Sequence, residues 1–267
     1  MIRRVTEREI AILQYLAVYK FLTRTHFMKL LHLKNRNQVQ LALDRLRTGK
    51  KAFVASTDKM VVAGVGSFEQ FHFLTKRGAE FVISELGIKE PKYPVVPNRK
   101  PTQDHNHKKQ TLNIEIAINS AFPVDFGDRY FDHVGSQRSD GTLAPKTKII
   151  FNRQGQTLRS DLIFGMSERL YCVEIHMGKD TLKGMEQIDQ YAQAITLGNP
   201  AIQYGYKYDA RVLWVFEHKS CMEALMQRTL ETKKYDLFAE HFLFQTLEDF
   251  NPVRWVNLKG IDVMLHP

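Results

Sequence analysis

The sequence contains few cysteines, no long apolar run and no complete nucleotide-binding loop. Only Cys172 and Cys221 occur among the 267 residues, without Cys-x-x-Cys spacing, so neither a disulfide framework nor a thiolate zinc site is expected. No apolar run approaches the length of a membrane span, and the chain opens MIRRVTEREI, so we expect a cytoplasmic protein. Gly178-Lys179-Asp180 lacks the upstream glycine and the Ser/Thr of a P-loop.

Positive charge is concentrated at the N-terminal end of the chain. Residues 1–109 hold 21 Lys and Arg against 9 Asp and Glu, a balance of +12, whereas residues 110–267 hold 17 against 20, a balance of −3. Neutralising phosphates and releasing their counterions supplies affinity for DNA that does not depend on sequence. We therefore expect the N-terminal part to bind a polyanion; the alternative is a basic surface that only confers solubility.

Residues 1–90 have the pattern of a small helical DNA-binding domain. Thr6 and Glu9 form a capping-box signature, and the apolar spacing after them predicts a helix from Glu7 to Tyr19. The other expected elements are helices over 25–32, from Asn35 onward and over 75–86, and strands over 52–56 and 70–74. This order predicts a winged helix-turn-helix in which residues 57–69 form the wing.

The third of these helices is the expected reading helix. The side chains of its first turn that can hydrogen-bond base edges or phosphates in a major groove are Arg36, Asn37, Gln38 and Gln40. Lys50 and Lys51 follow the helix and are expected to contact backbone phosphate. Trihelical units also mediate protein contacts, but the local charge favours DNA.

Four of the nine prolines fall within residues 91–101, which excludes a helix there. We expect an extended linker over 91–102 and a second domain over 103–267. The elements expected in that domain are helices over 104–121, 182–197 and 222–233, and strands over 148–151, 158–164, 169–176, 211–217 and 242–247. Helices flanking a sheet make the chain α/β (α+β), with a three-layer second domain.

Acidic residues lie on the hairpin expected over 158–176. A turn over 165–168 would pair Asp161 with Cys172 and make Glu174 the diagonal neighbour of Asp161 on the same face. Side chains alternate along a strand, so His176 shares that face. Two carboxylates and an imidazole are therefore expected to converge.

Converging carboxylates repel each other unless a cation lies between them, and oxygen ligands of this kind suit Mg²⁺ or Mn²⁺. Such a metal can activate water or polarise a phosphodiester. The alternative is an ordinary amphipathic hairpin whose acidic residues face solvent or pair with Arg159, which the expected register places opposite Glu174.

The spacing around these carboxylates resembles the core of the PD-(D/E)XK nuclease superfamily. Asp161 is followed after twelve residues by Glu174-Ile175-His176, and then by a helix carrying Gln187 and Tyr191. The Gln-x-x-x-Tyr spacing resembles the branch that contains the RecB-like nucleases. In sequence and layout the chain is most similar to the replication-relaxation family of plasmid proteins, which pair an N-terminal winged helix with a restriction-endonuclease-like domain. That family includes the MobC class of conjugative relaxases.

The resemblance implies a plasmid mobilisation relaxase that binds transfer-origin DNA and nicks one strand by metal-dependent phosphodiester chemistry. Asp161 and Glu174 would hold Mg²⁺ or Mn²⁺, and Gln187 and Tyr191 would support the site or contact phosphate. The implied partners are double-stranded plasmid DNA and other relaxosome or coupling proteins.

The chain departs from the family pattern at two positions. Ser160 stands where many members have proline, and His176 stands where the nuclease motif has lysine. Either His176 or Lys179, three residues on, would orient the water or the scissile phosphate. His107 and Asn113 resemble a pair in the family pattern, so His107 either supports the site, transfers a proton, or is simply a core residue.

Two other interpretations stay open. The protein could be a non-enzymatic relaxosome accessory factor or plasmid replication regulator that uses a degenerate nuclease fold as a scaffold. It could also be a defence endonuclease that cuts linear duplex at many copies of a site. Metal-dependent nicking of supercoiled plasmid would favour the relaxase over the accessory factor.

Overall fold

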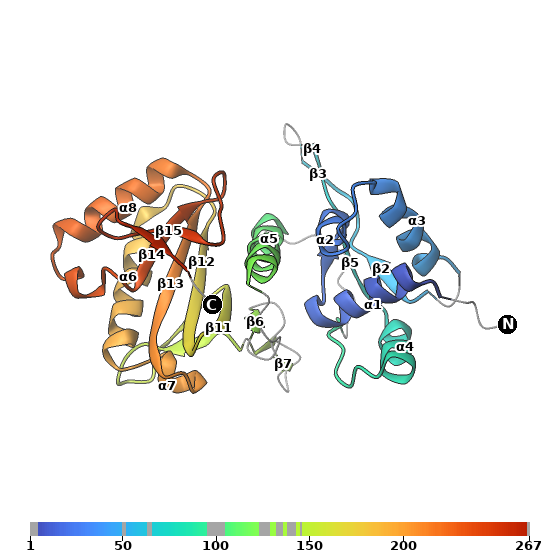
Figure 1. Cartoon of the computed structure of the whole chain (residues 1–267), viewed down its shortest axis with the longest axis horizontal. Coiled ribbons are helices and arrows are strands. Elements are labelled where there is room, and N and C mark those ends of the chain that lie inside the picture. Colours follow the sequence, from blue (N-terminus) through green and yellow to red (C-terminus); the bar gives the residue numbers. More distant parts are fainter. Residues whose placement is uncertain are drawn as a thin grey trace. The chain divides into compact units, whose positions relative to one another are not determined.

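The computed structural model of the chain (Figure 1) contains mixed helices and sheets, which confirms the expected α/β class. It describes residues 5–49, 52–62, 66–94, 105–122, 129–131, 136–137, 143–144 and 146–265. The chain divides into two compact units, Met1–Ile116 and Ala117–Pro267. This boundary lies C-terminal to the linker expected over 91–102. Residues 95–102 of that linker lie outside the described part of the chain. None of the described helices is long and apolar enough to cross a membrane.

The first unit combines helices with a small sheet and a hairpin. Its helices are α1 (Glu7–Tyr19), α2 (Arg24–Leu30), α3 (Arg36–Arg47), α4 (Lys76–Leu86) and α5 (His105–Ala121), the last of which continues past the unit boundary. Three strands form a sheet in the order β1 (Leu22–Thr23), β5 (Phe71–Leu74) and β2 (Val54–Ser56). The hairpin consists of β3 (Met60–Val62) and β4 (Gly66–Phe68).

Side-chain caps set where the first helices begin. The N–H of Glu9 donates to Oγ1 of Thr6 over 3.3 Å, and the N–H of Thr6 donates to Oε2 of Glu9 over 2.8 Å, so the capping box is confirmed. Asn35 caps α3 by accepting the N–H of Asn37 over 2.9 Å. The helix expected from Glu7 to Tyr19 coincides with α1, and the expected strands at 52–56 and 70–74 appear as β2 and β5.

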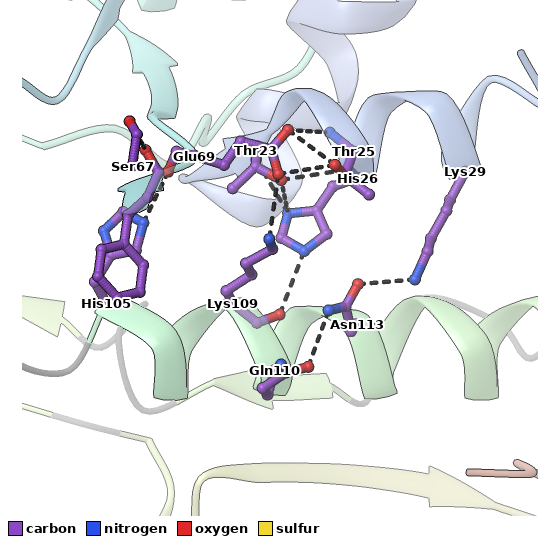
Figure 2. Close-up of polar contacts among 11 residues, drawn as sticks. Thr23, Thr25, His26, Lys29, Ser67, Glu69, His105, Lys109, Gln110 and Asn113 are labelled. Atoms are coloured by element: carbon purple, nitrogen blue, oxygen red, sulfur yellow. Dashed lines mark hydrogen bonds and ion pairs between the residues drawn. The ribbon is translucent and has the colours of Figure 1, made fainter. Parts of the chain in front are cut away.

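A polar cluster around Glu69 holds α5 against the rest of the first unit (Figure 2). The carboxylate of Glu69 accepts the backbone N–H of Thr25 over 2.8 Å and its hydroxyl over 2.9 and 2.8 Å. Nζ of Lys109 on α5 lies 3.3 Å from Oε2 of the same carboxylate. The Glu69 charge is thus matched by three kinds of partner.

Two histidines extend this cluster along α5 (Figure 2). Nε2 of His105 lies 2.8 Å from the carbonyl oxygen of Glu69, and Nε2 of His26 lies 3.3 Å from the carbonyl oxygen of Lys109. One turn further along, Nζ of Lys29 donates to Oδ1 of Asn113 over 2.8 Å. Contacts over this length make α5, up to the unit boundary, an integral part of the first unit.

The second unit is built on a seven-stranded sheet in the order β16-β15-β14-β13-β12-β11-β6. Its strands are β6 (Arg129–Phe131), β11 (Leu162–Met166), β12 (Arg169–His176), β13 (Tyr208–Phe216), β14 (Phe242–Thr246), β15 (Arg254–Asn257) and β16 (Asp262–Met264). The pairs β12–β13 and β13–β14 are parallel and the others antiparallel. Short strands pair apart from it, β7 (Ser136–Gln137) with β8 (Leu143–Ala144) and β9 (Lys148–Ile150) with β10 (Thr157–Arg159).

The helices of the second unit pack on the sheet through a shared apolar core. They are α6 (Thr181–Thr196), α7 (Ala201–Tyr204), α8 (Lys219–Glu231) and a 3₁₀ turn, η2 (Asp236–Phe238). Cys172 and Trp214 from the strands meet Ile188 of α6 and Leu225 of α8 in this core. The expected three-layer arrangement stays a prediction, since α6 and α8 belong to one layer that covers this core.

The expected hairpin register is wrong by two residues. The structure pairs Phe164 with Tyr171 and Leu162 with Val173, across a two-residue turn at Ser167 and Glu168. Both turn residues have positive φ, 51° and 61°, which gives the twist that favours tight hairpins. A shift of two residues leaves every side chain on its expected face, so Asp161 and Glu174 still converge.

Gly165, expected in the turn, lies in β11 instead. A Cβ at this position would stand 1.6 Å from the hydroxyl oxygen of Tyr206, so a larger residue here would displace the Tyr206 side chain. The strand expected over 158–164 is also interrupted, because β10 ends at Arg159 and β11 begins at Leu162. Arg159 pairs with Lys148 rather than standing opposite Glu174, so that expectation was wrong.

Candidate active site

Asp161 occupies the bend between β10 and β11, where main-chain contacts fix it beside the end of β12. Its N–H donates to the carbonyl of Val173 over 3.1 Å, and its Oδ2 accepts the N–H of Ile175 over 2.8 Å. Continuing the register of the hairpin by one pair places Asp161 next to Glu174. The backbone thus presents the first carboxylate to the strand that carries the second.

Ser160 stabilises this bend through hydrogen bonds of its backbone and its side chain. Its N–H donates to the carbonyl of Thr147 over 3.0 Å, and its hydroxyl lies 3.0 Å from the carbonyl oxygens of both Leu162 and Val173. Proline, which the resemblance would place here, has no N–H to donate. Serine therefore uses a contact that proline could not make, and the departure from the family pattern is compatible with the geometry.

Glu174 is buried, with 3 % of its surface exposed, and both of its carboxylate oxygens are held by α6. The hydroxyl of Tyr191 donates to Oε1 over 2.5 Å, and Nε2 of Gln187 donates to Oε2 over 2.9 Å. Gln187 and Tyr191 are one helical turn apart, so their spacing lets two donors reach one carboxylate. These contacts orient Glu174, and the expected role of the two residues in a catalytic site stays a prediction.

The two carboxylates form an electrostatically unfavourable pair. Burial raises the pKa of Glu174 well above its ordinary value, and the negative charge of Asp161 raises this pKa further. The hydrogen bonds from Tyr191 and Gln187 and the charge of Lys183 oppose the rise without cancelling it. A cation placed between the carboxylates would relieve this repulsion.

The donor set fits Mg²⁺ or Mn²⁺. Carboxylate oxygens are the ligands that these cations prefer, and Mg²⁺ is often held by one or two carboxylates with water and substrate phosphate completing its shell. The described residues include no cluster of three or more His, Cys, Asp or Glu side chains, so water and phosphate would have to fill the other positions. Oε1 of Gln187 is buried with no hydrogen-bond partner among the described residues, and can accept from such a water.

His176, which stands in the lysine position of the nuclease motif, is held in an aromatic stack. Its ring centroid lies 5.2 Å from that of Trp214 at an interplanar angle of 25°, and 4.8 Å from that of Phe216 at 12°. The ring is half-buried at the end of β12. This packing restricts the imidazole, whereas a lysine ammonium at the same position would extend on a flexible stem.

Lys179 and Lys183 flank the N-terminus of α6, and both side chains are exposed. Lys179 lies in the connection from β12, before the capping residue Asp180, which accepts the N–H of Leu182 over 3.0 Å. Lys183 lies one helical turn before Gln187, and its charge lowers the pKa of Glu174. Sequence analysis missed Lys183, although its spacing of four residues from Gln187 would have been sufficient to find it.

The residues predicted to read DNA lie at the start of α3, and they differ in how exposed their side chains are. Arg36 and Asn37 are exposed, whereas Gln38 and Gln40 are half-buried. Oε1 of Gln40 accepts from Arg24 over 2.9 Å and its Nε2 donates to Asp44 over 2.8 Å. Arg36 and Asn37 are therefore the more accessible of these four side chains. Lys50 and Lys51 lie outside the described residues.

His107 and Asn113 both belong to α5, in the first unit. His107 is half-buried, and its carbonyl oxygen accepts the hydroxyl of Thr111 over 3.0 Å. Asn113 is engaged by Lys29 and by Gln110, to whose Oε1 its Nδ2 donates over 3.1 Å. The contribution of His107 to the carboxylate site stays a prediction.

The second unit is thus a mixed α/β unit that brings Asp161, Glu174, Gln187 and Tyr191 together. No family model matches the chain, and comparisons with curated proteins and with solved structures found no match. Function therefore has to be inferred from the fold class and the geometry of this site.

Proposed function

We propose that the protein is a plasmid mobilisation relaxase of the replication-relaxation type, most like the MobC class. It binds transfer-origin DNA through a winged helix-turn-helix in the first unit. A PD-(D/E)XK nuclease-like second unit then nicks one strand with the help of Mg²⁺ or Mn²⁺. The observation that carries this proposal is the buried carboxylate Glu174, set beside Asp161 and held by Gln187 and Tyr191.

The arrangement of this pair supports metal-dependent chemistry more than a structural role. An interior carboxylate with only a structural role is normally matched by a cation, whereas Glu174 receives hydrogen bonds from neutral donors and has a like charge beside it. Perturbed carboxylates of this kind concentrate at functional sites. When bound, the metal would polarise the phosphodiester and activate water.

The residues of the chain itself have definable tasks in this chemistry. Asp161 and Glu174 hold the cation, and the N–H of Ile175 fixes the orientation of Asp161. Gln187 and Tyr191 hold both oxygens of Glu174, so that its carboxylate cannot rotate away from its neighbour. Such supporting contacts orient ligands and raise the precision of the site.

The first unit supports the DNA-binding part of the proposal. The order of α1, α2 and α3, followed by β2, the β3–β4 hairpin and β5, is the order of a winged helix-turn-helix. The exposed residues Arg36 and Asn37 at the start of α3 are suited to base edges or phosphate. The charge balance of +12 over residues 1–109 favours a polyanionic partner.

One observation favours the non-catalytic alternative, an accessory factor or replication regulator. His176 is packed against Trp214 and Phe216 of β13 instead of extending as a cation. If no other cation serves the site, the carboxylate pair has no partner for the transition-state charge, and the unit would only be a scaffold for DNA binding.

A nicking assay on supercoiled plasmid that carries the cognate transfer origin tests the proposal. The protein should convert the plasmid to the open-circular form with Mg²⁺ or Mn²⁺ and not with EDTA. Cleavage of linear duplex at many places would instead indicate a defence endonuclease. Sequence-specific binding without nicking under either metal would establish the accessory-factor alternative.

A further inference from the structure

The N-terminal part of α6 carries a cation that neither the aromatic stack nor the nuclease motif accounts for. Lys183, Gln187 and Tyr191 follow one another at intervals of four residues, so they lie along the same side of the helix. Two of them hold the carboxylate of Glu174, over 2.9 and 2.5 Å. Lys183 is therefore the next residue outward along the side of α6 that faces the carboxylate pair.

Exposure increases in the same direction along α6. Tyr191 is fully buried with 0 % of its surface exposed, Gln187 is half-buried and Lys183 is exposed. The side of α6 that holds the carboxylate of Glu174 thus becomes solvent-exposed at the N-terminal turn of the helix. The Lys183 ammonium lies at this exposed end, where it is accessible to a phosphate.

Electrostatics agree with this placement. The charge of Lys183 lowers the pKa of Glu174. Arg228 of α8 also lies near the start of α6, but its guanidinium donates to the hydroxyl of Thr181 over 2.6 Å. Lys183 is thus a basic residue whose charge acts on Glu174.

We propose that Lys183 supplies the cationic group of this site by binding a non-bridging oxygen of the DNA phosphate beside Asp161 and Glu174. The inference rests on the proposed function, since it assigns a role in the same site. Lys183 replaces the lysine that His176 displaces, from the helix instead of the strand. A flexible stem on a helix delivers a point charge to a phosphate as well as a stem on a strand does.

A binding experiment with the full chain tests this role without requiring cleavage. Affinity for a short fluorescein-labelled duplex of random sequence is measured by anisotropy in Ca²⁺ and in EDTA. The gain in affinity on adding Ca²⁺ reports phosphate bound at the metal-loaded carboxylates. Lys183→Ala should lose about tenfold of that gain, the size expected for one charge-assisted hydrogen bond. Lys183→Arg should keep most of it.

Lys179→Ala tests the rival source of the charge, because Lys179 is the exposed lysine, four residues earlier, that the sequence also suggests for this role. It should behave as the wild type in Ca²⁺ and in EDTA. Loss of the gain in Lys179→Ala but not in Lys183→Ala would overturn the inference. So would an equal loss of affinity in Ca²⁺ and EDTA for Lys183→Ala, because the lysine would then act only through general charge.

The outcomes separate the inference from the proposed function. In one outcome, Ca²⁺ raises the affinity of the wild type but not that of Lys183→Ala, and the wild type does not nick in Mn²⁺. This result would support phosphate binding by Lys183 and contradict the proposed nicking activity. If the wild type nicks and Lys183→Ala has the same affinity and nicking rate, only the role proposed for Lys183 is contradicted. If the wild type shows no gain with Ca²⁺, the role of Lys183 is overturned, and the nicking assay in Mg²⁺ or Mn²⁺ decides the proposed function by itself.

Discussion

Glu69 in the first unit and Glu174 in the second are both withdrawn from solvent, and their surroundings shift their pKa in opposite directions. Burial by itself raises the pKa of each. Around Glu69 the hydrogen bonds from Thr25 and the charge of Lys109 outweigh burial, so its pKa is lowered. Around Glu174 the charge of Asp161 adds to burial, and its pKa is raised.

The difference separates a carboxylate that holds structure from one that is available for chemistry. Glu69 ties α2 and α5 together through the neutral donors of Thr25 and the ammonium of Lys109, and folding makes it more acidic. Glu174 is also held in place by hydrogen bonds, but it lies beside the negative charge of Asp161. Two neighbouring carboxylates are tolerated where a bound cation neutralises their repulsion. This contrast is the physical basis for placing the candidate active site in the second unit.

Acid should affect the first unit most, because its buried imidazoles must stay neutral. Burial lowers the pKa of His26 to about 4 and of His72 to about 4. In the unfolded chain these groups titrate near pH 6.5, so protons bind preferentially to the unfolded state between about pH 6.5 and 4. Stability is constant above this window and is lost as the pH falls through it, by about 3 kcal/mol for each histidine.

Hydrogen exchange resolved by segment would measure this loss at pH 7 and pH 5. Protection should fall in α2 and β5, while β12 and β13 should keep theirs, since a raised pKa of Glu174 makes the folded second unit bind protons more readily in acid. His72→Gln should reduce the pH dependence of the first unit. Equal loss of protection in both units would contradict the contrast.

Removing the charge of Glu174 should eliminate nicking and leave the fold intact. Glu174→Gln and Asp161→Asn each remove a metal ligand while preserving shape, and we expect nicking to fall at least on the order of 10²-fold. DNA binding should persist, or tighten because repulsion toward phosphate is removed. Wild-type rates in both variants, measured on cognate supercoiled plasmid, would show that the pair is not the site.

Glu69→Gln is the counterpart in the first unit and should destabilise the protein by about 1–3 kcal/mol. It leaves Lys109 without its ionic partner and weakens the bonds from Thr25. Glu174→Gln should leave the midpoint of thermal unfolding unchanged or raise it, because it removes repulsion from Asp161. Scanning calorimetry of the two variants would decide; a larger loss for Glu174→Gln than for Glu69→Gln would reverse the roles assigned to the two carboxylates.

Helices and candidate site residues could be predicted from sequence because their signals are local. Caps at Thr6 and Asn35 lie next to the helices that they begin, and the intervals between Gln187 and Tyr191 follow from helical geometry. Asp161 was expected opposite Cys172, but it was placed correctly on the same face as Glu174, because a shift of two residues preserves the face of every side chain.

The turn and the Glu69 cluster could not be predicted in this way. Glycine is typical of turns, but Gly165 lies in β11, where it packs closely against the side chain of Tyr206. Ser167 and Glu168 adopt positive φ without the glycine or asparagine that usually marks such a turn. Lys109 lies forty residues after Glu69, and no periodic pattern connects positions so far apart.

The smallest effect should come from the reading helix, where base contacts and phosphate contacts can be separated. Asn37→Ala should lower the preference for cognate over unrelated duplex by about 1 kcal/mol, because it removes a base-edge donor and acceptor from an exposed position on α3. Replacing Lys50 and Lys51 with alanine should weaken all duplexes alike and reduce the salt dependence of binding. Competition binding at several salt concentrations measures both; if Asn37→Ala weakens all duplexes equally, α3 contacts only the backbone and specificity must come from elsewhere in the chain.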